Sequence, residues 1–187
     1  MQNLFPKFKK LAQDLLYILI EIIPAQIVNE NAWEDPSTGQ RRVDMRKLIL
    51  ASHGSLAEGL KSAAAMILGD AINISAYGLD TWVTPKSIFD EVRKELDRAP
   101  DTEFIILCDI KGGSVHNCMM ELLVRPDVSI FTGMNLTMVL EVAVLDENIA
   151  IRDESETVME SSRNNICYFN RQMISKMMKE EGEDELW

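Results

Sequence analysis

The sequence predicts an α/β fold: a doubly wound, mainly parallel sheet of four strands ordered 2-1-3-4. Three observations point to this fold. Apolar segments of strand length alternate with segments of helical period between Met45 and Leu145. The third of the strands is apolar throughout, as expected of a central strand that helices cover on both faces. Glycine-containing and serine-containing turns separate the strands from the helices that follow them, as in βαβ units.

Four strands are expected in this region. Lys47–Ser52 and Glu103–Ile110 are nearly continuous apolar runs, and Val128–Thr132 is a shorter one. Ile72–Leu79 alternates between apolar and polar residues, which is typical of a strand with one covered face. Since parallel strands need crossover connections, each strand is expected to lead into a helix.

The helices follow from capping residues and apolar period. They are expected at Ser55–Leu68, from Thr84-Pro85 onward, at Ser114–Val124 and at Asn135–Leu145. Proline suits the first turn of a helix, asparagine suits its cap, and Gly69 ends the first of these helices. Apolar residues share one face of each of the first two helices: Leu56, Leu60, Ala63, Ala64 and Ile67, then Ile88, Phe89, Val92 and Leu96.

The ends of the chain differ from this regular region. Residues 1–44 are interpreted as an extension, with an amphipathic helix around residues 11–23 and a polar linker from Asn29 to Asp44. Met45 is typical of a natural start of translation, so the extension is expected to be dispensable. The domain is expected over residues 45–176, and residues 177–187 are an acidic, solvated tail.

Composition excludes some classes of function. The chain has 187 residues, which suits one domain, and its formal net charge of −11 argues against nucleic acid as a partner. Its three cysteines, Cys108, Cys118 and Cys167, have no metal-ligand or redox spacing. They fit a reducing compartment, and no metal or cofactor is expected.

The ends of two predicted strands carry side chains that can take part in a reaction. His53 follows the first strand and Asp109 lies at the end of the third. Because the first and third strands are neighbours at the topological switch point, both side chains should face one crevice. A neutral imidazole whose Nδ1–H is held by a carboxylate can attack through Nε2. An isolated histidine in a turn can also be a mere capping residue.

The Gly112-Gly113-Ser114 turn follows Asp109 and precedes a helix. Backbone N–H groups of Gly113 and Ser114, with the Ser114 hydroxyl, are expected to hold phosphate oxygens. The pattern predicts a phosphoryl-transfer site, although the same turn is typical of an ordinary serine-capped helix. His116 is expected near the rim of the site and not in catalysis, and Lys111 either adds positive charge or is simply exposed.

Three motifs together resemble the mannose-type enzyme IIA proteins of the bacterial sugar phosphotransferase system. They are Ser52-His53-Gly54 with Ala57-Glu58-Gly59, Asp109-x-x-Gly112-Gly113-Ser114-x-x-Asn117, and Gly133-Met134-Asn135-Leu136. The resemblance spans residues 45 to about 175. Val115 and Thr137 depart from the prolines common in that family, which bears on loop rigidity and partner choice.

The resemblance implies a cytoplasmic phosphocarrier. It implies that His53 accepts a phosphoryl group from HPr, with Asp109 as its partner, and passes it to a IIB component. The membrane components IIC and IID would be reached only indirectly. Gly54, Asn117 and Asn135 would form the site wall. Two alternatives remain: a regulatory phosphohistidine module, and the phosphotransfer subunit of a dihydroxyacetone kinase.

The resemblance also implies an antiparallel fifth strand at the sheet edge, exchanged between the subunits of a homodimer. Ile166–Phe169, within a short apolar segment bounded by asparagines, falls where that strand is expected. The alternatives are that this strand folds back onto its own sheet, or that a helix continues through Met173–Met178. Before it, Ile149–Val158 is expected to contain a short helix.

Overall fold

The computed structural model describes residues 45–69 and 72–174, so the expected helix near residues 11–23 and the acidic tail lie outside the described residues. The strands are β1 (Met45–Ser52), β2 (Ile74–Gly78), β3 (Thr102–Cys108) and β4 (Val128–Thr132). The helices are α2 (Leu56–Leu68), α3 (Leu79–Trp82), α4 (Pro85–Arg98), α5 (Ser114–Met119), the 3₁₀ helix η1 (Met120–Val124), α6 (Leu136–Val144) and α7 (Ile151–Asn164).

The four strands form one parallel sheet in the order β2-β1-β3-β4, which confirms the predicted fold class and strand order. β1 and β3 are the central pair, and Ala51 lies opposite Cys108 at their carboxyl ends. The residues that follow Ala51 and Cys108 therefore lie side by side at one edge of the sheet. That register places the site described below.

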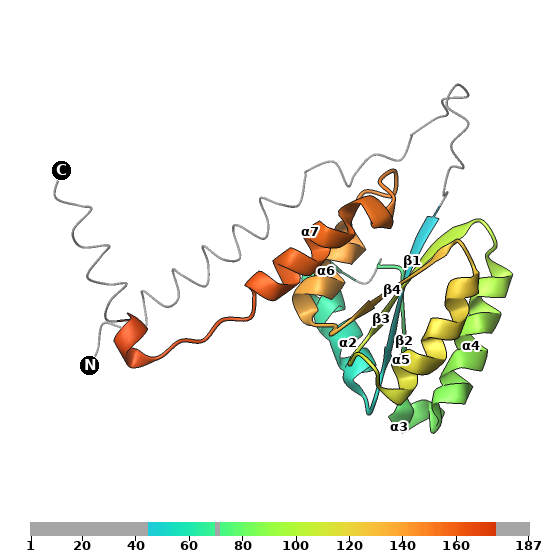
Figure 1. The fold of residues 1–187 in the computed structure, drawn as a ribbon, viewed down its shortest axis with the longest axis horizontal. Helices are drawn as coiled ribbons and strands as arrows, with labels where there is room; N and C mark the ends of the chain where they lie inside the picture. The colour runs from blue at the N-terminus through green and yellow to red at the C-terminus, as the bar shows by residue number, and fades with distance from the viewer. Residues whose placement is uncertain (1–44, 70–71, 175–187) are drawn as a thin grey trace. The chain divides into compact units, whose positions relative to one another are not determined.

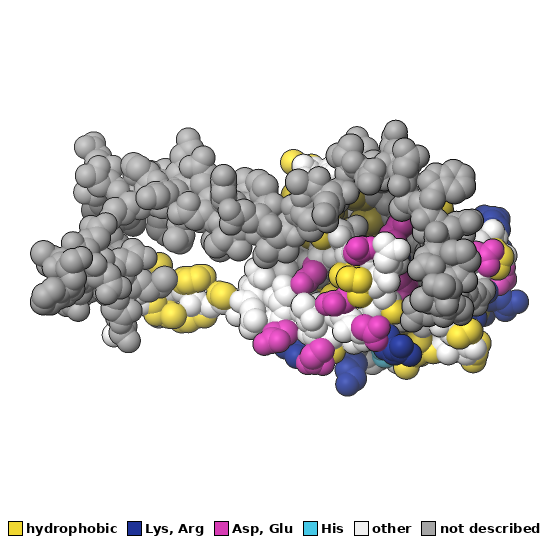
Figure 2. Space-filling view, turned by 90° about the horizontal axis from the view of Figure 1, so that it is seen from above, with side chains coloured by type: hydrophobic (Ala, Val, Ile, Leu, Met, Phe, Trp, Pro, Cys, Tyr) yellow, Lys and Arg dark blue, Asp and Glu magenta, His cyan; other side chains and the backbone are white. Residues whose placement is uncertain are grey.

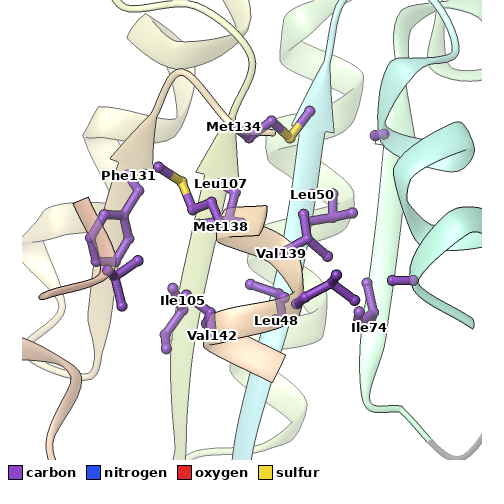
Figure 3. Close-up of a cluster of buried hydrophobic side chains, with 14 of the residues drawn as sticks. Leu48, Leu50, Ile74, Ile105, Leu107, Phe131, Met134, Met138, Val139 and Val142 are labelled. Carbon is purple, nitrogen blue, oxygen red and sulfur yellow. The ribbon is translucent and has the colours of Figure 1, made fainter. Parts of the chain in front are cut away.

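Helices cover both faces of the sheet, as predicted (Figure 1). On one face α2, α6 and α7 pack on side chains such as Leu50 and Leu107, where Met138 and Val139 fill the space over the strands (Figure 3). On the other face α4 and α5 pack on the alternate side chains of the same strands, such as Ile106. Each large apolar side chain buried in this way contributes about 1.5–3 kcal/mol to folding.

The predicted helix starts are confirmed for two helices. Thr84 Oγ1 accepts the Ser87 N–H at 3.1 Å at the start of α4, and Asn135 Oδ1 accepts the Met138 N–H at 3.0 Å at the start of α6. The helix expected over Ser114–Val124 consists of α5 followed by the tighter η1. The short α3 was not predicted, because four residues are too few to show a helical period.

The apolar face expected for α2 is only partly correct. Leu56 and Ile67 stay 47% and 49% exposed, while Ala57 and Ala64 are fully buried against the sheet. Small side chains allow a helix to approach a sheet closely, so alanines form the contact and the larger residues lie at its margin. The longer α4 follows expectation, because Ile88, Phe89, Val92 and Leu96 are all buried.

The segment after α6 differs from its predicted form. The short helix expected within Ile149–Val158 is the 14-residue α7, which extends to Asn164. Ile166–Phe169 forms no strand within this chain, and the side chains of Ile166, Tyr168 and Phe169 are exposed. The fifth strand and its exchange are therefore not shown.

The described surface is mixed in charge. On the face that Figure 2 shows, acidic side chains are spread over the described surface and interspersed with lysine, arginine and apolar side chains. Among the described helices, none is both long enough and apolar enough to cross a bilayer.

Candidate phosphoryl-transfer site

The carboxyl ends of β1 and β3 bring His53 and Asp109 together. Asp109 directly follows Cys108, which pairs with Ala51, and His53 comes two residues after Ala51. Asp109 Oδ2 lies 2.8 Å from the backbone N of His53 and 2.8 Å from its ring Nδ1. Its other oxygen, Oδ1, accepts the N–H of Ile110 at 2.8 Å. Both oxygens of the carboxylate therefore have donors, and His53 is held through both its backbone and its ring.

The His53 and Asp109 side chains differ in their exposure to solvent and in their roles. The Asp109 side chain is only 11% exposed, whereas the His53 side chain is 43% exposed. An ionised carboxylate only accepts hydrogen bonds, so the Nδ1 of His53 must carry the proton. In the neutral ring the lone pair then lies on Nε2, where the Ser114 hydroxyl is 3.1 Å away and can donate. This arrangement leaves an exposed imidazole with an unprotonated Nε2, which is the form of a nucleophile.

The Gly112-Gly113-Ser114 turn packs directly on the imidazole. A Cβ atom built on Gly113 would lie 3.0 Å from Cε1 of His53 and 2.7 Å from Cγ2 of Ile110, so a side chain would displace the ring or the turn. Gly112 has φ +79°, a region that glycine enters without strain. The turn therefore requires glycine at both positions, for two different reasons.

The backbone N–H groups of the two glycines already have acceptors in this structure. The Gly113 N–H donates to the carbonyl of Ile110 at 3.2 Å, and the Gly112 N–H donates to Nδ1 of His116 at 3.2 Å. In this state the Gly113 N–H is thus engaged with Ile110, and its contact with a phosphate oxygen stays a prediction. Ser114 is the residue of the turn whose polar side chain contacts His53.

The three residues expected at the site wall make different contacts. Gly54 follows His53 with φ +55°, and its carbonyl accepts the Asp80 N–H at 3.5 Å. Asn117 lies behind the turn, where its Nδ2 donates to the carbonyl of Gly112 at 3.1 Å. The Asn135 side chain caps α6. Asn117 thus supports the turn, and Asn135 is engaged in capping.

Two side chains that support the site were not among the predicted site residues. The buried Ser52 Oγ accepts the Ala57 N–H at 2.8 Å and so caps α2 from the end of β1. Glu58 Oε1 accepts the Gly78 N–H at 2.9 Å, which joins the first turn of α2 to the end of β2. In the sequence, the signal for Ser52 is a polar residue five positions before Ala57, near the start of a predicted helix. The signal for the partner of Glu58 is Gly78, a glycine at the end of a strand.

Cys108 is close to the site but unsuited to attack. Its side chain is fully buried in the core below Asp109. Burial, together with the negative charge of Asp109, raises the pKa of the Cys108 thiol to about 12. The thiol therefore stays protonated at neutral pH, and a protonated thiol is a poor nucleophile. Among the described residues, no group of three or more His, Cys, Asp and Glu side chains is arranged to hold a metal ion.

Comparisons with known proteins agree with the fold. The family described as PTS system fructose IIA component, EIIA-man, matches residues 47–159, a range that includes His53, Asp109 and the glycine turn. The chain is 25% identical over 146 residues to the fructose-specific EIIA component of the PTS of Bacillus subtilis (strain 168). That alignment covers 76% of this chain and 100% of the relative.

Two solved structures share the architecture. The mannose/sorbose specific IIA subunit of the phosphotransferase system from Enterococcus faecalis is 26% identical, with a TM-score of 0.56, over 67% of this chain and 96% of that one. The phosphotransferase system component EIIA from Streptococcus agalactiae has a TM-score of 0.61 at 22% identity, over 67% of this chain and 98% of that one, and it supports the fold alone.

Proposed function

Because the chain belongs to the EIIA-man family of phosphotransferase system (PTS) IIA components, we propose that His53 accepts a phosphoryl group from HPr and transfers it to a IIB component. A PTS IIA component is a phosphocarrier of sugar uptake. The choice of His53 as the residue that carries the phosphate rests on the site, whereas HPr and IIB as partners rest on membership of the family. The observation that carries the choice of His53 is the 2.8 Å contact of its Nδ1 with Asp109 Oδ2, which leaves Nε2 of this 43% exposed side chain as the attacking atom.

The proposed reaction is a reversible exchange of P–N bonds. The lone pair of His53 Nε2 attacks the phosphorus of phospho-HPr, a bond forms between Nε2 and phosphorus, and the P–N bond to HPr breaks. The proton on Nδ1 stays on the ring, which becomes positively charged, and the Asp109 carboxylate stabilises that charge. Transfer to IIB runs through the same steps in the opposite direction, with a nitrogen of IIB as the attacking atom.

Ser114 has a defined part in this proposal. Its hydroxyl lies 3.1 Å from Nε2, so an incoming phosphoryl group must replace that hydrogen bond. The hydroxyl can then donate to an oxygen of the phosphoryl group instead. Gly112 and Gly113 shape the turn, and the Gly113 N–H becomes available to phosphate only if its bond to Ile110 opens. The site thus needs only small movements to accept a phosphoryl group.

The remaining parts of the proposal concern organisation. We propose a cytoplasmic protein whose functional domain spans residues 45–176, with residues 1–44 dispensable for transfer. The family match begins at residue 47, and the described core begins at Leu48. We also propose a homodimer in which Ile166–Phe169 of each subunit pairs with the sheet edge of the other.

Labelling the protein tests the central proposal. Incubation with phosphoenolpyruvate, enzyme I and HPr should place one acid-labile, base-stable phosphate on the chain, and His53→Ala should abolish it. The chain has two histidines, so His116→Ala is the matched control and should reach the same labelling at the end point. Full labelling of the His53→Ala protein would refute the assignment.

A further inference from the structure

The second histidine of the chain, His116, lies on α5 and contacts the backbone of the glycine turn. Nδ1 of His116 accepts the N–H of Gly112 at 3.2 Å, and Nδ2 of Asn117 donates to the carbonyl of Gly112 at 3.1 Å. Side chains of α5 thus bind both polar groups of the Gly112 backbone. Gly112 itself is exposed, so packing restrains it little and these two hydrogen bonds are its main restraint.

The bond to Gly112 requires one particular tautomer of His116. A backbone N–H can only donate, so Nδ1 must present a lone pair, and in the neutral ring the proton lies on Nε2. Asn117 Oδ1 is also 3.2 Å from this Nδ1. If Nδ1 carried a proton, it would donate to Asn117 Oδ1, and the Gly112 N–H would lose its acceptor. The position of one proton on His116 therefore decides whether Gly112 is held.

The turn held in this way touches the reacting atom of the proposed function. Gly113 packs against Cε1 of His53, and the hydroxyl of Ser114 lies 3.1 Å from Nε2. A movement of Gly112 is transmitted to both, since they are the next two residues. Misplacement of a contacting group by about 1 Å is enough to slow a reaction that depends on orientation.

We propose that His116 is a positioning residue for phosphoryl transfer: through Nδ1 it holds the Gly112-Gly113-Ser114 turn against the imidazole of His53. This inference rests on the proposed function, because the turn matters only if phosphate arrives at Nε2. His116 makes no bond to phosphorus and takes no proton during the transfer. Its contribution is to keep Ser114 at the distance at which its hydroxyl reaches the site.

Two substitutions separate the acceptor atom from the bulk of the ring. In His116→Asn, Oδ1 is two bonds from Cβ, as Nδ1 is in histidine, so the acceptor for Gly112 is retained. His116→Phe keeps a ring of similar size and removes the acceptor. We expect the phenylalanine variant to transfer phosphate about three- to tenfold more slowly at saturating phospho-HPr, with an unchanged KM, and the asparagine variant to stay near the wild-type rate.

Met120→Phe is the matched control, since it places the same ring four residues after His116, at the start of η1. Met120 is 43% exposed, so the ring can be accommodated there. It should transfer at the wild-type rate. A wild-type rate for His116→Phe, or an equal loss in His116→Asn and His116→Phe, would overturn the inference. If the phenylalanine variant fails to fold, the transfer rate of the asparagine variant and the nuclear magnetic resonance of the Gly112–His116 hydrogen bond still test the inference.

Nuclear magnetic resonance of the unphosphorylated protein measures the bond independently of transfer. We expect a scalar coupling across the hydrogen bond between the Gly112 amide nitrogen and His116 Nδ1, and ring nitrogen shifts of the Nε2–H tautomer. Absence of the coupling, or a proton on Nδ1, would overturn the inference and leave the proposed function intact. A wild-type chain that accepts no phosphate on His53 would instead refute the proposed function itself.

Discussion

Asp109 binds His53 twice through the same oxygen: Oδ2 accepts both the backbone N–H and the ring Nδ1–H of His53, each at 2.8 Å. Since Oδ1 accepts the Ile110 N–H, the hydrogen-bond partners of this carboxylate among the described residues are all donors. A group with only acceptor atoms is needed at this position, and the carboxylate meets that need without rearrangement. The ring is oriented and its tautomer is set by one side chain.

Asp109→Asn is predicted to slow phosphoryl transfer by about 10- to 1,000-fold while the protein stays folded. The amide loses the negative charge that stabilises a positive imidazole, and in either orientation its NH₂ group faces a donor. Transfer rates from phospho-HPr, with melting curves, measure the effect. Asp90→Asn is the control, because Asp90 is on α4, with its side chain 48% exposed, and should leave the rate unchanged. An unchanged rate in Asp109→Asn would mean that Asp109 is only structural.

Gly78→Ala is predicted to destabilise the protein by about 1–3 kcal/mol. The new Cβ would lie 2.2 Å from the carbonyl oxygen of Gly54 and 2.4 Å from Oε2 of Glu58, so backbone next to His53 must move. Gly59→Ala is the matched control: nothing lies within 4 Å of its Cβ position, and alanine is the better helix former. It should stabilise the protein by about 0.5–1 kcal/mol. Denaturant unfolding measures both, and equal stability of the two variants would contradict this account.

The strand order and the meeting of His53 with Asp109 could be predicted from the sequence. Long apolar runs mark β1 and β3 as central strands, and residues that end adjacent parallel strands must lie close together. The role of Gly78 could not be predicted in the same way. The sequence shows a glycine near the end of the predicted strand Ile72–Leu79, but its distance from Gly54 depends on how β2 meets the turn that follows β1.

Other details depend on packing or on atoms that a pattern does not place. The helical period of α2 was clear, yet Ala57 and Ala64 form its buried face while Leu56 stays about half exposed. The sequence placed His116 near the site, but only the structure shows its Nδ1 on the Gly112 N–H. Hydrogen bonds to the backbone leave no periodic signal, so sequence patterns do not reveal such supporting residues.

A chain that begins at Met45 is predicted to fold and to accept phosphate as well as the full chain does. β1 begins at Met45, and the hydrophobic clusters of the described residues consist of side chains from Leu48 onward. Melting temperature and the end point of labelling from phospho-HPr measure the comparison. A large fall in melting temperature, or loss of solubility, would show that residues 1–44 cover apolar surface of the domain.

The last prediction is that the protein is a homodimer and that residues 164–187 are needed for it. β4 is an outer strand of the described sheet, and an outer strand presents unpaired backbone groups to a partner. Ile166, Tyr168 and Phe169 are 79%, 73% and 60% exposed, an apolar surface that a single described chain leaves uncovered. Antiparallel pairing of this segment with β4 of a second subunit would cover both.

Sedimentation of three forms tests the dimer. The full chain should sediment as a dimer at micromolar concentration, and deletion of residues 164–187 should give monomers or insoluble protein. Deletion of residues 177–187 alone is the control, because it removes the acidic tail and keeps Ile166–Phe169, so it should remain dimeric. A monomeric full chain would rule out the exchanged strand. A dimer that survives the longer deletion would place the interface elsewhere, since the pairing segment would then be absent.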